Sequence, residues 1–287
     1  MKNKTSLVVS LVFISILVLM ICTVCGLCGF GFSSIKSMLD DASVVGKNQI
    51  EESQFYEKDG NVYYCFTGEF GYCARTDMKY PGSFLLVNQD IAKDNNFVYF
   101  EKNKLEKADP TSFSIISSKY FQDKNYVYYK DQLIKNAESS SFKLLGENGR
   151  YSKDKNHVYY YERLVANADP NSFSIFSASE LYGKDSTNVY CEESKIEGAD
   201  VKTFTIISSS YTKDAKNVFF YGDIIPYADP QTITVLDSFG FYSKDKNNVY
   251  YRTEIVPNAD AVTFVKGEGS QIFVDKNHTY REGKVLK

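Results

Sequence analysis

The sequence predicts an all-β repeat protein: a tandem array of about eight antiparallel units of roughly 30 residues each, preceded by one N-terminal transmembrane helix. Three observations predict this class. A motif of Asp, Asn and Val-Tyr-Tyr recurs at nearly constant spacing, the chain holds 23 Tyr and 21 Phe, and a long uncharged segment precedes the first repeat. Fixed periods of about 20 to 50 residues are typical of repeat architectures, and Tyr and Phe suit half-buried strands.

The uncharged segment predicts a membrane anchor. Leu7 to Leu27 are 21 residues without a charge, which as a helix span roughly 31 Å, enough for a bilayer core. Lys2 and Lys4 precede it, so the positive-inside tendency places the N-terminus in the cytoplasm and the body of the chain on the far side. A cleaved signal peptide is the alternative, although this apolar run is longer than a usual signal core and lacks a small-x-small cleavage site at its end.

These features divide the chain into three parts. We expect a cytoplasmic stub and anchor, or signal peptide, at residues 1–32, a linker at 33–54 and the β repeat domain at 55–287. The protein is then a single-pass membrane protein whose C-terminal domain is exported to the periplasm or the cell surface.

Two acidic marks define each repeat. The first is the Asp that opens each related turn, at Asp59, Asp94, Asp123, Asp154, Asp185, Asp214, Asp245 and Asp275; the turn reads Asp-x-Asn in six units, DSTN at 185–188 and DAKN at 214–217. A second acid, preceded by Ala, follows six of these at a constant interval, at Asp109, Glu138, Asp169, Asp200, Asp229 and Asp260. The interval from the second mark to the next turn Asp varies, being shorter from Asp109 to Asp123 than from Glu138 to Asp154. Constant spacing predicts a tight hairpin, and variable spacing predicts a looser turn.

The stretch DKNYVYYKDQLIKNAE at 123–138 predicts that hairpin. Val127–Tyr129 form one strand, Lys130 and Asp131 the turn, and Leu133 and Ile134 the returning strand. This fold places the two acidic marks of one unit, Asp123 and Glu138, close together. A third segment runs from a Phe four residues after the second mark, or Ile233 in one unit, to a Tyr three residues before the next turn. Each unit is thus predicted to be a three-stranded antiparallel meander.

The Val-Tyr-Tyr strands place apolar side chains on both faces, because successive strand residues point to opposite sides. Stacking neighbouring units face to face covers both faces, as in repeat proteins. An open β superhelix, or solenoid, is favoured, since the repeats of propellers are longer, at about 40 to about 50 residues. A β-propeller of small blades is the alternative.

The strings DKNYVYY, DKNHVYY and DKNNVYY, combined with the fixed Ala-Asp spacing, resemble the bacterial DKNYY repeat proteins. The resemblance covers about residues 55–287. It implies an exported or envelope-associated bacterial protein and supplies no catalytic residues to carry over. The ends depart from the pattern: KDGNVYY at 58–64 is one residue shorter, and DKNHTYR at 275–281 is followed by no Ala-Asp.

The repeated acids do not predict an active site. Pairs such as Asp154 with Asp169, or Asp245 with Asp260, suggest calcium binding or glycosidase chemistry. The Asp-x-Asn turn, however, lacks the further acids and the Gly of a calcium loop, and an active site normally occurs once. We therefore expect these acids to cap turns and predict no enzyme, no cofactor and no metal site. His157 and His278 share one turn position and are expected to be exposed.

The cysteines and the net charge give further expectations about disulfides, lipid attachment and nucleic-acid binding. Cys65 and Cys73 lie on opposing arms of the first hairpin, which predicts a disulfide in an exported domain. Cys191 replaces an aromatic residue and is expected to be a small core residue. Cys22, Cys25 and Cys28 follow large apolar residues, which disfavours lipoprotein processing. A net charge of −3, from 33 basic and 36 acidic residues, gives no reason to expect nucleic-acid binding.

Two functions fit these expectations. The favoured one is a membrane-anchored, non-enzymatic interaction scaffold for an envelope protein, as repeat surfaces commonly serve. The alternative is an envelope carbohydrate-binding module whose exposed tyrosines stack on polysaccharide. The two differ in whether the strand tyrosines are buried between units or exposed in a row.

Overall fold

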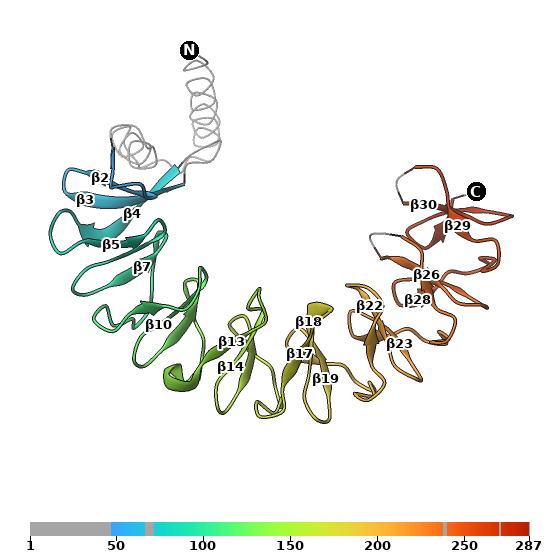
Figure 1. Cartoon of the computed structure of the whole chain (residues 1–287). Coiled ribbons are helices and arrows are strands. Elements are labelled where there is room, and N and C mark those ends of the chain that lie inside the picture. Colours follow the sequence, from blue (N-terminus) through green and yellow to red (C-terminus); the bar gives the residue numbers. More distant parts are fainter. Residues whose placement is uncertain (1–46, 67–71, 238–239, 270, 287) are drawn as a thin grey trace, which may run out of the picture. The chain divides into compact units, whose positions relative to one another are not determined.

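The computed structural model describes residues 47–66, 72–237, 240–269 and 271–286 (Figure 1). These residues form eight four-stranded antiparallel sheets, each a meander in chain order. The predicted anchor, Leu7–Leu27, lies outside the described residues. Within the described residues, no helix is long and apolar enough to cross a membrane.

The chain divides between Lys104 and Leu105 into two compact units. The first unit holds two sheets, with strands β1 (Asn48–Gln49), β2 (Phe55–Lys58), β3 (Asn61–Phe66), β4 (Tyr72–Lys79), β5 (Leu85–Asn88), β6 (Ile91–Lys93), β7 (Val98–Phe100) and β8 (Asn103–Lys104). Because β1 pairs with β2, the first sheet begins inside the stretch predicted as a linker at 33–54. A two-residue polar edge strand carries no apolar alternation that a sequence could reveal.

The second unit holds six sheets in chain order. Their strands are β9 (Ser114–Ile115), β10 (Tyr120–Gln122), β11 (Val127–Tyr129), β12 (Gln132–Leu133); β13 (Lys143–Leu145), β14 (Tyr151–Lys153), β15 (Val158–Tyr160), β16 (Arg163–Leu164); β17 (Ser174–Phe176), β18 (Ser179–Lys184), β19 (Val189–Cys191), β20 (Ser194–Lys195); β21 (Thr205–Ile206), β22 (Tyr211–Lys213), β23 (Val218–Phe220), β24 (Asp223–Ile224); β25 (Thr234–Val235), β26 (Tyr242–Lys244), β27 (Val249–Tyr251), β28 (Glu254–Ile255); and β29 (Val265–Lys266), β30 (Ile272–Val274), β31 (Thr279–Arg281), β32 (Lys284–Val285).

The prediction of three strands per unit is wrong: each sheet has four. The predicted third segment reverses within itself, as where β13 and β14 pair with Leu145 opposite Tyr151. Gly146 and Gly149, between these strands, have positive φ angles of 74° and 59°, a conformation that glycine adopts without a steric cost. Each sheet therefore joins the end of one predicted unit to the hairpin of the next. The reversing segments are alike in only two sheets, as IISSKY at 115–120 and IISSSY at 206–211, and differ in the others, so the spacing alone did not reveal them.

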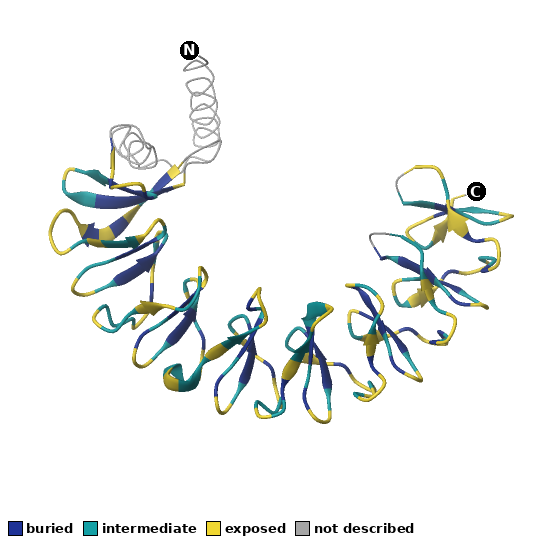
Figure 2. Ribbon diagram, viewed as in Figure 1, coloured by how far each residue is buried: buried dark blue, intermediate teal, exposed yellow. Residues whose placement is uncertain are grey.

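The two central strands of each sheet supply the core (Figure 2). Val158 and Tyr159 are completely buried, and Tyr160 is 1% exposed, so adjacent residues are buried on opposite faces. The largest fully buried side chains of the described residues are all tyrosines, in both units. Both faces of the Val-Tyr-Tyr strands are thus covered.

Tyrosine hydroxyls join consecutive sheets of the second unit. Tyr120 donates to the carbonyl of Gly149 in the following sheet at 2.8 Å, and Tyr151 donates to the carbonyl of Glu192 at 2.6 Å. The hydroxyl of Tyr211 donates to the carbonyl of Phe241 at 3.2 Å. A buried hydroxyl needs a hydrogen-bond partner, and the next repeat provides it, which explains why Tyr rather than Phe occupies this position.

Candidate functional site

The turn aspartates are the most regular polar feature of the protein. The Oδ1 atom of Asp154 accepts the backbone N–H groups of Asn156 and His157, both at 2.7 Å. These are the local bonds that favour Asp at the start of a turn. The same pair of bonds is made by Asp94, Asp123, Asp185, Asp214, Asp245 and Asp275.

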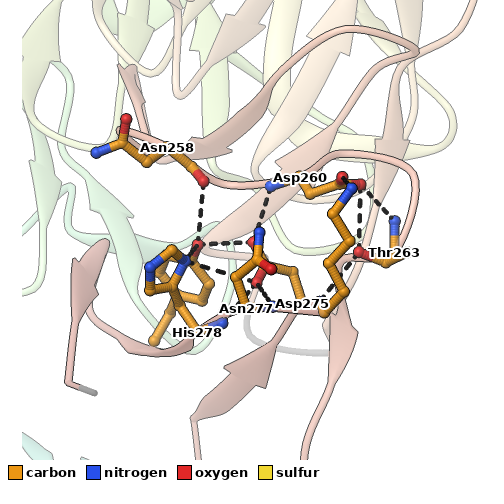
Figure 3. A network of polar contacts seen from close by, with 8 residues as sticks. Asn258, Asp260, Thr263, Asp275, Asn277 and His278 are labelled. Atoms are coloured by element: carbon orange, nitrogen blue, oxygen red, sulfur yellow. Dashed lines mark hydrogen bonds and ion pairs between the residues drawn. The ribbon is translucent and has the colours of Figure 1, made fainter.

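The second carboxylate oxygen binds groups that are more distant in sequence. In Asp154, Oδ2 accepts the backbone N–H of Glu138 at 2.8 Å and the hydroxyl of Tyr159 at 2.9 Å. Figure 3 shows the same network in the last sheet, where Asp275 binds the backbone of Asp260 at 2.8 Å and the hydroxyl of Tyr280 at 2.7 Å. Four donors therefore surround one carboxylate.

Asp154, Asp185 and Asp245 are buried, and their carboxylates remain charged. Asp185 is 4% exposed. Burial by itself raises the pKa of this carboxyl, but hydrogen bonds from Thr187, Tyr190 and Asn188 outweigh burial and lower the pKa to about 2. The pKa values of Asp154, Asp245 and Asp275 are lowered in the same way, by hydrogen bonds that outweigh burial. A carboxylate held so far below neutral pH and shielded from solvent stabilises a turn and is poorly suited to proton transfer.

The hydrogen-bonded pairs differ from the predicted ones. Each turn Asp binds the backbone of the second acid that precedes it, so Asp154 pairs with Glu138 and Asp185 with Asp169. The remaining pairs are Asp109–Asp123, Asp200–Asp214, Asp229–Asp245 and Asp260–Asp275. The two members of a predicted pair take part in different networks: Asp245 binds the backbone of Asp229, whereas the backbone of Asp260 is bound by Asp275. The sequence could not distinguish the two arrangements, because a turn Asp lies almost equally far from the second acid before it and the one after it.

The carboxylates of the second acids face outward. Asp109 forms an ion pair with Lys124 at 2.9 Å and Asp229 with Lys246 at 3.1 Å, and Glu138 and Asp260 pair with Lys155 and Lys276. Each Lys directly follows a turn Asp. The two acids therefore do not share one cation site, and the described residues contain no group of three or more His, Cys, Asp or Glu that could hold a metal ion.

The histidines and cysteines lie at separate places. His157 and His278 each lie 3.8 Å from the Asp that opens their turn. Cys65 and Cys73 face each other across β3 and β4 and form a disulfide. Cys191 is a buried free thiol, and burial raises its pKa to about 12, so it stays uncharged and is a poor nucleophile.

One surface feature was missed from the sequence. The second residue of the fourth strand is exposed and apolar in four sheets of the second unit: Leu164, Ile224, Ile255 and Val285. The residue that follows the first three, for example Val165, is buried. We name these four positions the edge row. In most repeats an apolar residue occupies this position, just after the hairpin turn. That recurrence is the sequence signal from which the edge row could have been predicted.

Comparison with known proteins agrees with the repeat pattern. The model of the DKNYY family matches residues 30–132, 125–253 and 233–284 in overlapping segments. No curated protein and no solved structure matches the chain. The three segments together span most of the 287 residues, and the chain therefore belongs to the DKNYY family.

Proposed function

We propose that the protein is a membrane-anchored, non-enzymatic interaction scaffold whose repeat domain binds a protein of the cell envelope. The observation that carries this proposal is the edge row, in which the same position is exposed and apolar in four of the six sheets of the second unit. Leu164, Ile224, Ile255 and Val285 are each 40–45% exposed. Exposed apolar surface of this kind marks interaction sites when it is contiguous or repeated.

The burial of the strand tyrosines favours a protein ligand over a polysaccharide laid along the repeats. A glycan face requires a row of exposed aromatic rings. Tyr128, Tyr159, Tyr190, Tyr250 and Tyr280 are completely buried, and their hydroxyls are occupied by protein acceptors. The more exposed tyrosines of the second unit, Tyr221 and Tyr227, are at turn positions of one repeat.

We further propose an open array within residues 105–287. The tyrosine hydroxyls that leave their own sheet bind the adjacent sheet or the loop just before their own, as Tyr120 reaches Gly149 and Tyr190 reaches Asn167. Nearest-neighbour contacts of this kind are typical of open solenoids. The anchor at residues 7–27 would hold the array at the membrane, with the repeats on the exported side.

Site-specific photo-crosslinking in cells tests the scaffold. A photo-reactive residue replaces Leu164, Ile224 or Ile255 in the edge row, or Lys202 or Gln231 at exposed turns as matched controls. We expect one discrete protein to be crosslinked from the edge row and not from the turns. Crosslinks to polysaccharide from all three edge-row positions, or equal crosslinking from all five positions, would refute the proposal.

A further inference from the structure

A cavity lies between the last two sheets of the second unit, β25–β28 and β29–β32. Its volume is about 130 Å³. Phe241, Tyr242 and Tyr251 supply its aromatic wall. An enclosed cavity of roughly 150 Å³ binds benzene; this cavity is slightly smaller but open on one side, so it can take one six-membered ring whose substituents point toward the opening.

Another junction of the same protein shows a ring in the equivalent place. Between β9–β12 and β13–β16, the ring of Tyr161 packs 4.9 Å from the ring of Tyr129, which itself lies 4.9 Å from Tyr120. At the last junction the equivalent pair, Tyr242 and Tyr251, keeps the 4.9 Å separation. The position of Tyr161, directly after the third strand, is taken there by Glu282.

The backbone at the two positions is alike, with φ of 54° at Tyr161 and 49° at Glu282. A side chain at this position can therefore cover the aromatic pair. Glu282 brings a carboxylate instead of a ring and leaves the space open.

Polar groups surround the opening. The side chains of Lys266, Gln271 and Glu282 line it and make no hydrogen bond or ion pair with the rest of the described chain. Asp237 also lines it, and its carboxylate accepts the backbone N–H groups of Phe241 and Tyr242 at 3.2 and 3.1 Å, which leaves lone pairs free.

The residues that line the cavity include one cation, Lys266, and two carboxylates, Asp237 and Glu282. Arg252 does not line the cavity, but its guanidinium lies 5.1 Å from the centre of the Phe241 ring and 5.4 Å from that of Tyr251, two rings of the wall. With this second cation beside the cavity, the local charges balance. An uncharged ligand with several hydroxyl groups matches this balance better than an ion does.

We propose that this cavity binds one neutral pyranose ring, such as the end of an envelope glycan. The ring occupies the place that Tyr161 fills at the other junction and packs its C–H face on the aromatic wall. Its hydroxyls exchange hydrogen bonds with Lys266, Gln271 and Glu282. A few polar groups around an apolar wall are the usual composition of a small-ligand site. None of the four edge-row residues lines the cavity, so its test does not require the protein partner.

Saturation-transfer NMR with the full chain in detergent tests the proposal. The probes are glucose, galactose and N-acetylglucosamine, with phenol as a ring that lacks the hydroxyl periphery. We expect transfer to at least one sugar and at least a tenfold loss of affinity in Glu282→Tyr, which refills the cavity. Glu192→Tyr, the same change at the equivalent position of another sheet, should leave binding unchanged.

Lys266→Ala is a second variant at an exposed position, for which we expect at least a threefold loss of affinity with unchanged thermal unfolding. No transfer to any sugar, transfer to phenol alone, or an equal loss in both Glu→Tyr variants would overturn the proposal.

Discussion

At the scale of single residues, a buried carboxylate is stabilised by hydrogen bonds rather than by a cation. Most turn Asp residues of the second unit bind a tyrosine hydroxyl five residues later, as Asp185 binds Tyr190 at 2.8 Å. Asp214 is the exception, because Phe219 occupies that position, and its Oδ2 atom accepts the backbone N–H of Asp200 at 2.9 Å. Comparing the repeat that has Phe219 with the repeats that have Tyr therefore measures how much one hydroxyl contributes to stability.

Exchanging these residues should change stability in opposite directions. Tyr159→Phe should destabilise its repeat by about 2 kcal/mol, because a hydrogen bond to a charged group is lost. Phe219→Tyr should stabilise its repeat by about 1 kcal/mol. Hydrogen exchange at the amides of Glu138 and Asp200 reports the local free energy of opening. Faster exchange at Asp200 in Phe219→Tyr would contradict this account.

The turn carboxylates also predict acid sensitivity. The folded-state pKa of Asp185 is about 2, below its usual value of 3.8. A lowered pKa contributes stability that is present above pH 4 and lost as the pH falls toward 2. Asp154, Asp245 and Asp275, whose pKa values are also lowered, act in the same direction. Urea midpoints measured from pH 6 to pH 2 should therefore fall steeply below pH 4, and a flat profile would contradict the prediction.

At the scale of elements, tight turns depend on residues that accept a positive φ. One position after the hairpin of six repeats has a φ of 61° to 77°, and it is occupied by Lys107, Asn136, Asn167, Gly198, Tyr227 and Asn258. Asn and Gly are common in this conformation, whereas Tyr is disfavoured. Tyr227 is also 85% exposed, so little packing offsets the backbone strain.

Tyr227→Asn should therefore stabilise the second unit by about 1 kcal/mol. The reverse change, Asn258→Tyr, should destabilise it by a similar amount. Urea denaturation of both variants followed by far-UV circular dichroism measures the two effects. Equal destabilisation by both substitutions would show that the backbone conformation does not decide the outcome.

At the scale of the whole molecule, the repeats form two compact units that share no disulfide among the described residues. The Cys65–Cys73 disulfide lies within the first unit, and both cysteines pack with Tyr56 and Tyr63. In repeat proteins, stability is roughly a sum of local contributions and contacts between neighbours. The effect of the disulfide should therefore be local.

Replacing both cysteines, Cys65→Ala with Cys73→Ala, should destabilise the first unit by about 2 to 3 kcal/mol, as expected for a short closed loop. Hydrogen exchange should accelerate in β2 and β3 and stay unchanged in β26 and β27. Acceleration of the same size in both units would mean that the chain unfolds as one cooperative body.

The sequence by itself determined the features that depend on near neighbours. The period, the Val-Tyr-Tyr strands, the tight hairpin and the Asp-x-Asn turns follow from bonds between residues close in sequence, and the positions of Cys65 and Cys73 follow from that same hairpin. Tertiary structure decided what the local pattern left open. It set the reversal that gives each sheet a fourth strand, the pairing of Asp154 with Glu138 rather than Asp169, and the exposure of Leu164 beside the buried Val165. Asp154 lies almost equally far in sequence from Glu138 and Asp169, and Leu164 and Val165 are both apolar, so only the packing of the sheets distinguishes the alternatives.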